Sequence, residues 1–361
     1  MKTLRIAIDP EDLESEASRA AIETAAAILR QGGLVAFPTE TVYGLGANAL
    51  SVDAVEKIFR AKQRPAWDPL IVHISSANML AEVAKTPDNG PARELMRMFW
   101  PGPLTLLLRK TEQVPDMVTA GRPLVGIRMP AHPVARALIA AAGVPVAAPS
   151  ANSFGGISPT LAAHVLEDLD GRIDAVLDGG ETAHGLESTV VDASREPVVL
   201  YRPGVITIEM LRAICGEIVE WKPSDPQSEA PPESMPAPGA GIRHYAPKAR
   251  LIVIEEAFGE PVGHQAGALF QAVQSAAQAC SSVGILLPTD HPAAESIRAI
   301  PRTVILDWGN WSEPEMLAHR LFAGLRELDA IGAQVIVCPL PPPEGIGAAI
   351  RDRLLKAARV I

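Results

Sequence analysis

Residues 32–49 read GGLVAFPTETVYGLGANA, and this stretch indicates an α/β fold. The apolar run Gly33–Pro38 has the length and composition of a buried strand, and its proline ends it. The hydroxyls of Thr39, Thr41 and Tyr43 follow in a turn that contains two glycines. Polar groups at a strand end often meet a ligand in α/β sheets, but Thr and Gly are also common in helix caps and tight turns. The stretch alone leaves both interpretations open.

Short apolar runs alternate with Ala-rich stretches of helical period on both sides of this stretch, up to about residue 220. The alternation is not a regular βαβ repeat, so it predicts an α/β or α+β domain with a twisted mixed sheet. The expected strands are Gly33–Pro38, Leu70–His73, Leu104–Arg109, Val125–Met129, Val146–Ala148, Ala175–Asp178, Thr189–Asp192 and Val198–Tyr201. The expected helices are Ser18–Gln31, Val52–Ala61, Ala92–Phe99, Pro133–Ala142 and Thr160–Asp168.

Residues Pro223–Pro247 hold seven prolines in 25 positions and have the composition of a linker. The segment RHYAPKA at its end is unusual for an inert spacer, because it combines Arg, His and Tyr beside a Gly turn. A regular alternation follows and predicts a small doubly wound α/β domain, without the G-x-G-x-x-G of a dinucleotide site. Its expected elements are strands 251–255, 283–287, 303–307 and 334–339 and helices 263–279, 314–331 and 345–360.

The composition limits the class of protein. The 361 residues are 48% hydrophobic, which suffices for a sizeable core and suggests two domains. A net charge of −10, from 32 basic and 42 acidic residues, argues against a protein that binds mainly nucleic-acid phosphates. It does not exclude a local basic pocket. Three widely spaced cysteines predict neither a disulfide framework nor a zinc site. With no recognisable signal peptide or membrane span, we expect a cytoplasmic protein.

Several cations stand where an isolated charge is costly. Lys62 and Arg64 follow a helix and can hold a triphosphate. A favourable interaction with the helix dipole is the alternative, but it explains these two cations poorly. Arg128 interrupts an apolar strand and needs either a buried carboxylate or an anionic ligand. Arg202 stands at a strand end before a turn. His73 lies in an apolar run, where a histidine is more often part of the core than a ligand.

Hydroxyl and amide side chains form a second set of candidates. Ser150 and Asn152 follow a strand and lead to Ser158, so they can offer hydroxyls, amides and backbone N–H groups to an anion. The same residues can equally act as helix caps. Thr119 and Ser188 lie in two further polar turns. Each of these segments is weak by itself, and it is their combination that is specific.

Taken in order, seven motifs resemble the YrdC/Sua5 family: PTETVYGLGANA, KQRPAWDPLIVHI, WPGPLTLLL, VGIRMPAHP, APSANSFGGISPT, ESTVVD and LYRPG. The RHYAPKA segment and the α/β region after it resemble the long, Sua5 form of that family. The resemblance implies a twisted mixed-sheet domain with an open concave cavity at residues 1–212. It also implies a linker at 213–247 that folds over the active site, and a Rossmann-like domain at 248–361.

The resemblance further implies an activity. Members of the family join L-threonine, bicarbonate or CO2, and ATP with Mg2+ into threonylcarbamoyl-AMP and pyrophosphate, as an enzyme of the nucleotidyltransferase class. The product passes to the tRNA threonylcarbamoyl transferase machinery for the threonylcarbamoyl-adenosine modification of tRNA. The resemblance allows a weak contact between the protein and tRNA, and it implies no membrane partner. The alternative is a non-catalytic module of the same fold that binds double-stranded RNA or tRNA.

By motif position, the resemblance assigns two sets of residues. The expected L-threonine side comprises Thr39, His73, Thr119, Arg128 and Ser188. The expected ATP side comprises Lys62, Arg64, Ser150, Asn152, Ser158, Arg202 and Tyr245, with Mg2+ held by the ATP phosphates. No residue is assigned as an acid or base, because the reaction needs two positioned anions, charge neutralisation and exclusion of water.

Two positions depart from the family pattern. Asp68 stands where the family usually has Asn, and a carboxylate there can contact a metal or cap a turn. The segment Ala237-Pro238-Gly239-Ala240-Gly241 replaces the usual Ser-Pro-Gly-Met-Lys and lacks its cation, for which Arg243 is a candidate substitute.

Overall fold

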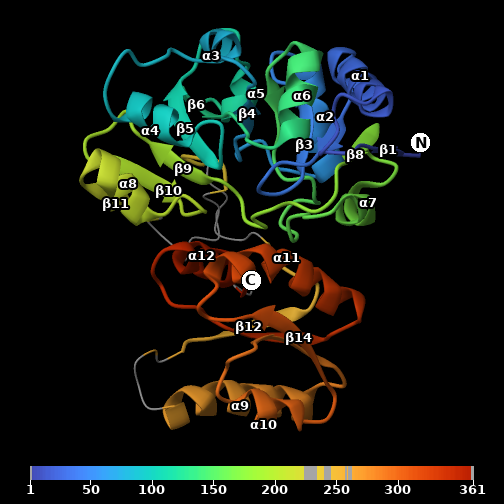
Figure 1. The fold of residues 1–361 in the computed structure, drawn as a ribbon, viewed down its shortest axis with the longest axis vertical. Coiled ribbons are helices and arrows are strands. Elements are labelled where there is room, and N and C mark those ends of the chain that lie inside the picture. The colour runs from blue at the N-terminus through green and yellow to red at the C-terminus, as the bar shows by residue number, and fades with distance from the viewer. Residues whose placement is uncertain (1, 223–233, 240–244, 257, 259–261, 359–361) are drawn as a thin grey trace. The chain divides into compact units, whose positions relative to one another are not determined.

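The computed structural model describes residues 2–222, 234–239, 245–256, 258 and 262–358 (Figure 1). The chain divides into two compact units. The first unit comprises Met1–Phe154, Ser158–Ala183 and Glu187–Ile242. The second comprises Arg243–Ile361 together with two short segments from the first half of the chain, Gly155–Ile157 and His184–Leu186.

The first unit contains a mixed sheet of 11 strands in the order β1-β8-β2-β3-β7-β4-β6-β5-β9-β10-β11 among the described residues. This confirms the predicted α/β class with a mixed sheet. The strands are β1 (Leu4–Ala7), β2 (Val35–Phe37), β3 (Gly44–Asn48), β4 (Ile71–His73), β5 (Leu104–Arg109), β6 (Leu124–Arg128), β7 (Val146–Ala147), β8 (Ala175–Asp178), β9 (Thr189–Asp192), β10 (Val198–Arg202) and β11 (Ile218–Glu220).

The helices of the first unit follow the expected positions within a few residues where a helix is expected. They are α1 (Glu16–Arg30), α2 (Val52–Lys62), α3 (Ala77–Val83), α4 (Pro91–Phe99), α5 (Asp116–Thr119), α6 (Pro133–Ala142), α7 (Ala162–Leu169) and α8 (Ile208–Cys215). Helices α1 and α6 lie side by side, as Figure 1 shows. Their alanines allow this close packing, and Ala25, Ala26 and Leu29 of α1 are fully buried in the core.

Strand β3 corrects the sequence analysis, which placed the GLG segment in a turn. It pairs antiparallel with both β2 and β7, in the middle of the sheet. Glycine favours turns in general, but here it serves close packing. A Cβ on Gly46 would come within 2.8 Å of both Phe37 Cε1 and Val146 Cγ1. The glycines of β3 are therefore required by packing against Phe37, and local strand propensity does not predict this strand.

Helix α2 shows how local signals place two candidate cations. The Ser51 hydroxyl accepts a hydrogen bond from Ala54 N at its start, which is an ordinary N-cap. Gln63 ends the helix in the left-handed conformation, with φ 55°, and Arg64 N donates back to Phe59 O at 2.9 Å. Lys62 therefore lies on the buried side of the last turn, and Arg64 leaves the helix in a different direction.

The second unit has a four-stranded parallel sheet in the order β12-β15-β13-β14. Its elements are β12 (Arg250–Ile254), α9 (Val262–Ala279), β13 (Val283–Pro288), α10 (Ala294–Arg298), β14 (Thr303–Gly309), α11 (Pro314–Ala330), β15 (Val335–Pro339) and α12 (Ile346–Ala358). Helices α9 and α10 cover one face of the sheet, and α11 and α12 cover the other (Figure 1). Two-sided cover explains why its central strands are buried along their whole length.

Two differences concern the linker. Residues 213–220, which the sequence analysis counted with it, form the end of α8 and strand β11, and β11 pairs with β10. Ala237, Pro238, Gly239 and Tyr245 are described, whereas Ala240, Gly241 and Arg243 lie outside the described residues. Among the residues that are described, no helix has the length and apolar character needed to cross a bilayer.

Candidate functional site

Arg128, at the end of β6, already has a carboxylate partner. Its side chain is buried, and Nη2 lies 2.7 Å from Oε1 of Glu40. Nη1 donates to the Thr41 hydroxyl at 2.9 Å, and Nε donates to Gly102 O at 3.3 Å. These contacts use three of the five N–H donors of a guanidinium, so two remain for a ligand. The sequence left open a carboxylate partner or an anionic ligand, and the structure shows the carboxylate partner, Glu40.

Glu40 is ionised by this arrangement. Burial alone would raise its pKa, but the charge and hydrogen bond of Arg128 outweigh burial and lower the pKa to about 2. Its Oε2 also accepts from the backbone N–H of His132 at 3.3 Å. Glu40 comes from the turn after β2, and so does Thr39. The Thr39 hydroxyl donates to Val42 O at 2.7 Å and lies 2.8 Å from the Thr41 hydroxyl, so it keeps this turn in shape.

His73 lies beside Arg128, because β4 and β6 are parallel and these two residues are in register. Its ring is 3% exposed and packs edge-on against Phe37. Burial, followed by the charge of Arg128, lowers the pKa of His73 to about 3, so the imidazole is neutral at physiological pH. Nδ1 has no hydrogen-bond partner within the part of the chain that the structure describes. A buried, unsatisfied ring nitrogen is costly in a core, which favours a ligand-facing histidine.

Lys62 carries a buried ammonium, and within the part of the chain that the structure describes no carboxylate is in contact with it. Its Nζ donates to Ser150 O at 2.6 Å and also to Asn152 O. Burial lowers the pKa of Lys62 well below its usual value, and the charge of Arg64 lowers it further. Two of the three ammonium donors are used, which leaves one for an anion. An anionic ligand next to Lys62 would stabilise the charged form of its ammonium, which burial destabilises.

Arg64 and Asp68 form a buried ion pair four residues apart. Nη2 of Arg64 is 2.9 Å from Oδ2 of Asp68, and the guanidinium also donates to the backbone oxygens of Asp68 and Pro69. The ring of Phe154 lies under the same guanidinium at 5.9 Å. Asp68 thus holds Arg64 in place. No group of three or more His, Cys, Asp or Glu side chains able to hold a metal ion is found among the described residues.

Ser188 and Arg202 contact each other directly, although the resemblance assigned them to different substrates. Arg202 donates from Nε to Ser188 O at 3.0 Å and from Nη2 to the Ser188 hydroxyl at 3.1 Å. That hydroxyl lies 2.8 Å from the hydroxyl of Thr105, at the start of β5. The three side chains are all buried and bring together β5, β9 and β10.

The linker residues 234–239 pack onto this part of the first unit. Met235 N donates to Trp67 O at 2.9 Å, and Arg122 donates twice to Ser234. Met235 and Ala237 are buried in one apolar cluster with Leu107, Val190 and Tyr201. Gly239 has φ +70°, and a Cβ there would lie 2.5 Å from Nη1 of Arg202. The described linker residues 234–239 therefore pack against Arg202 and its neighbours in the first unit.

Ser150, Asn152 and Ser158 occupy the loops between β7 and α7. The Ser150 hydroxyl donates to the Asn152 side-chain oxygen, and the Asn152 amide donates to Ser153 O at 2.8 Å. Ser158 is fully buried, and its hydroxyl donates to the carboxylate of Glu187. This last contact ties the loop before α7 to the residue that precedes Ser188.

Two expected site residues have local roles in the structure. The Thr119 hydroxyl donates to Asp116 O at 3.3 Å, within α5. The ring of Tyr245 belongs to the second unit, where it stacks on Phe322 with ring centres 5.6 Å apart. Their assignments to threonine and ATP stay predictions.

The sequence analysis missed four partners of the candidate residues: Glu40, Thr41, Thr105 and Glu187. Glu40 lies in the quoted PTETVYGLG motif, and the argument that Arg128 needs a carboxylate or an anion was the available signal. Thr105 and Glu187 became visible only when separate segments met in space.

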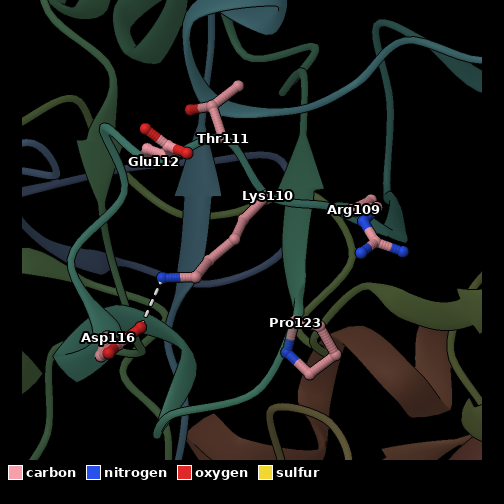
Figure 2. A pocket seen from close by; sticks show the side chains of 6 residues that line it. All are labelled: Arg109, Lys110, Thr111, Glu112, Asp116 and Pro123. Atoms are coloured by element: carbon pink, nitrogen blue, oxygen red, sulfur yellow. Dashed lines mark hydrogen bonds and ion pairs between the residues drawn. The ribbon is translucent and has the colours of Figure 1, made fainter.

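A surface hollow of about 370 Å3 lies apart from these groups, at the other end of β5 (Figure 2). Lys110 crosses it to reach Asp116 at 2.6 Å, and Arg109, Thr111, Glu112 and Pro123 complete its lining. It contains none of the candidate site residues.

Two family models match consecutive parts of the chain. The Sua5, YciO and YrdC model, described as "Telomere recombination", matches residues 27–204. A model described as "Threonylcarbamoyl-AMP synthase, C-terminal domain" matches residues 206–359.

Similar proteins extend over almost the whole chain. A threonylcarbamoyl-AMP synthase of Bacillus subtilis is 43% identical over 359 residues, covering 99% of this chain and 98% of that protein. One of Pyrococcus abyssi is 42% identical, covering 93% and 94%. The crystal structure of P. abyssi Sua5 complexed with L-threonine matches with a TM-score of 0.86 and 39% identity, covering 99% of this chain and 98% of that one.

Proposed function

This chain belongs to the Sua5/YrdC family, and from that membership we propose that it is a threonylcarbamoyl-AMP synthase. It would convert L-threonine, bicarbonate or CO2, and ATP into threonylcarbamoyl-AMP and pyrophosphate, which makes it a nucleotidyltransferase. The observation that carries the proposal is the 43% identity to the B. subtilis enzyme across nearly the full length of both chains. The geometry of the first unit supports it.

In this proposal Arg128 binds the carboxylate of threonine. Its two remaining donors suit a carboxylate, and Glu40, Thr41 and the Gly102 carbonyl hold the guanidinium in one orientation. Neutral His73, with an unsatisfied nitrogen, would accept or donate one hydrogen bond to the same substrate. The ordered groups reduce the entropy lost when threonine binds.

On the ATP side, Lys62 and Arg64 would contact the phosphates, together with Arg202. The Lys62 ammonium has one remaining donor, and its buried position gives it a strong preference for an anion. We propose that Mg2+ arrives with ATP and is held by its phosphates. The ion would neutralise charge on the leaving pyrophosphate.

The chemistry then requires positioning more than proton transfer. The amine of threonine attacks the carbon of CO2 and releases a proton to solvent, or attacks bicarbonate and releases water, and either route forms a carbamate. A carbamate oxygen attacks the α-phosphorus of ATP, and the bond to the bridging oxygen of pyrophosphate breaks. Buried cations would stabilise the charge on the phosphates in the transition state, and residues 234–239 of the linker would help to exclude water from the labile carbamate.

We also propose the cellular context. An acyl adenylate is reactive, so the product would pass to the tRNA threonylcarbamoyl transferase machinery, with at most weak contact to tRNA. The three cysteines, Cys215, Cys280 and Cys338, are all free thiols. This agrees with a reducing compartment such as the cytoplasm.

Pyrophosphate release tests the proposal. We expect the purified chain to release pyrophosphate from ATP only when both threonine and bicarbonate are present, without tRNA. Arg128→Ala should raise the threonine concentration needed by at least about tenfold, because a charge-assisted hydrogen bond is lost. Release that is unchanged when threonine is omitted would refute the assignment. Steeply salt-dependent tRNA binding without pyrophosphate release would favour the non-catalytic alternative.

A further inference from the structure

One face of α11 contacts three segments that come from distant parts of the chain. The contacts are made by His319 with its neighbour Ala318, by Phe322 and by Arg326. Positions 319, 322 and 326 are spaced by three and four residues, so they lie along one side of a helix. Each of the three segments belongs to the second unit and is adjacent to, or contains, a candidate site residue.

The first segment is His184–Leu186. Gly185 has φ +68°, and a Cβ at this position would lie 2.5 Å from His319 O and 2.7 Å from Ala318 O. These neighbours are helix backbone and cannot turn aside, so the close approach requires glycine. The residue after this segment is Glu187, which accepts the hydrogen bond from Ser158.

The second segment is Gly155–Ile157. Nη2 of Arg326 donates to Ile157 O, and Ala246 N donates to Gly155 O at 2.9 Å. The residue after this segment is Ser158. Helix α11 therefore holds the backbone on the N-terminal side of both partners in the Ser158–Glu187 hydrogen bond.

The third segment contains Tyr245. Its ring is buried between Phe322 of α11, at 5.6 Å, and the guanidinium of Arg353, at 5.2 Å. Arg353 is itself fully buried and pairs with Asp352 at 2.6 Å. Tyr245 adopts φ +67°, which is unfavourable for a tyrosine and is sustained by these contacts.

We propose that Phe322 and Arg326 of α11 are positioning residues for the nucleotide half of the reaction. They set the places of Ser158, Glu187 and Tyr245 without touching substrate. The proposal rests on the proposed function. A purely stabilising role for α11 is the alternative, and the two differ in which kinetic constant changes.

The test compares four variants of the full chain. Arg326→Met removes the donor to Ile157 O, and Arg326→Lys restores one donor. Phe322→Leu removes the ring under Tyr245. Arg320→Gln is the matched control, because Arg320 is an exposed residue of the same helix that donates only weakly to Asp307 O, at 3.4 Å.

For Arg326→Met and Phe322→Leu we expect the KM for ATP to rise by about tenfold while the KM for threonine changes less than about twofold. Arg326→Lys should recover most of the loss, and Arg320→Gln should match the wild type. In Arg326→Met, hydrogen–deuterium exchange should accelerate at 155–158 and 184–188 without a matching change in the strands of the first unit.

Equal increases in both KM values, or a loss of activity that follows the unfolded fraction, would overturn the positioning role. So would wild-type kinetics and exchange in Arg326→Met. If the wild-type chain itself releases no pyrophosphate, the proposed function fails, while the exchange experiment still tests whether α11 holds the two loops.

Discussion

The guanidinium of Arg128 lies 2.7 Å from the carboxylate of Glu40, and both side chains are buried. The cation that we assign to the threonine carboxylate is thus held by an anion of the protein before any substrate binds. A buried pair contributes little net stability compared with an apolar pair, but it fixes the orientation of a charge. The first two predictions follow from this relationship.

Removing Glu40 should damage both stability and threonine use. Glu40→Ala leaves Arg128 buried and unpaired, so we expect the free energy of unfolding to fall by about 3–5 kcal/mol in urea titrations. Glu40→Gln should cost less and should raise the KM for threonine more than that for ATP. Glu94→Ala, which breaks an exposed pair with Arg97, is the control and should cost under about 1 kcal/mol. A Glu40→Ala protein as stable as this control would contradict the prediction.

Acid should destabilise the protein in two overlapping pH ranges. The folded-state pKa of His73 is lowered from 6.5 to about 3, so the unfolded chain binds more protons below pH 6.5 and stability falls as pH falls through that value. The pKa of Glu40 is lowered from 4.5 to about 2, so its contribution to stability is lost as the pH falls between those two values. In unfolding titrations, His73→Gln should remove about 2 kcal/mol of the stability that is lost between pH 7 and pH 5, because the unfolded chain takes up the His73 proton over that range. An unchanged loss of stability would show that His73 is not buried as a neutral group.

Lys62→Ala should mainly weaken the use of ATP. The ammonium is fully buried, and its partners among the described residues are the carbonyls of Ser150 and Asn152. We expect the KM for ATP to rise by at least about tenfold, and more than that for threonine. The matched control is Lys57→Ala in the same helix, whose exposed ammonium donates to Gly32 O at 2.6 Å. Equal losses for both substrates would mean that Lys62 is a core residue.

The linker should be required for turnover and not for folding. Deleting residues 237–247 should lower activity while the first unit keeps its cooperative unfolding transition. Gly239→Ala is a gentler test, because a Cβ would meet Arg202, which Ser188 holds in place, and φ is +70°. Gly143→Ala is its control, with φ +68° and open space around the new Cβ. We expect a loss of activity in Gly239→Ala alone, and equal activity in both variants would restore the interpretation as a spacer.

The sheet class and several strands follow from the sequence because they depend on local signals. Strands β5, β8 and β9 lie at the expected residues, since buried apolar runs with clear ends identify themselves. Strand β3 does not, because its glycines are selected by contact with Phe37 and Val146 and not by strand propensity. The same limit applies to α8 and β11, which the proline content of the neighbouring linker obscured.

The sequence by itself determined that Arg128 needs an anion and that Lys62 and Arg64 stand together, and it predicted that the linker takes part in the reaction. Only the tertiary structure decided which partners they have. Glu40 reaches Arg128, Ser188 meets Arg202, and α11 joins the segments before Ser158 and Glu187. The physical reason is that a charged or polar residue in an apolar segment needs a partner, and this need can be recognised in the sequence. Which group becomes the partner depends on long-range packing.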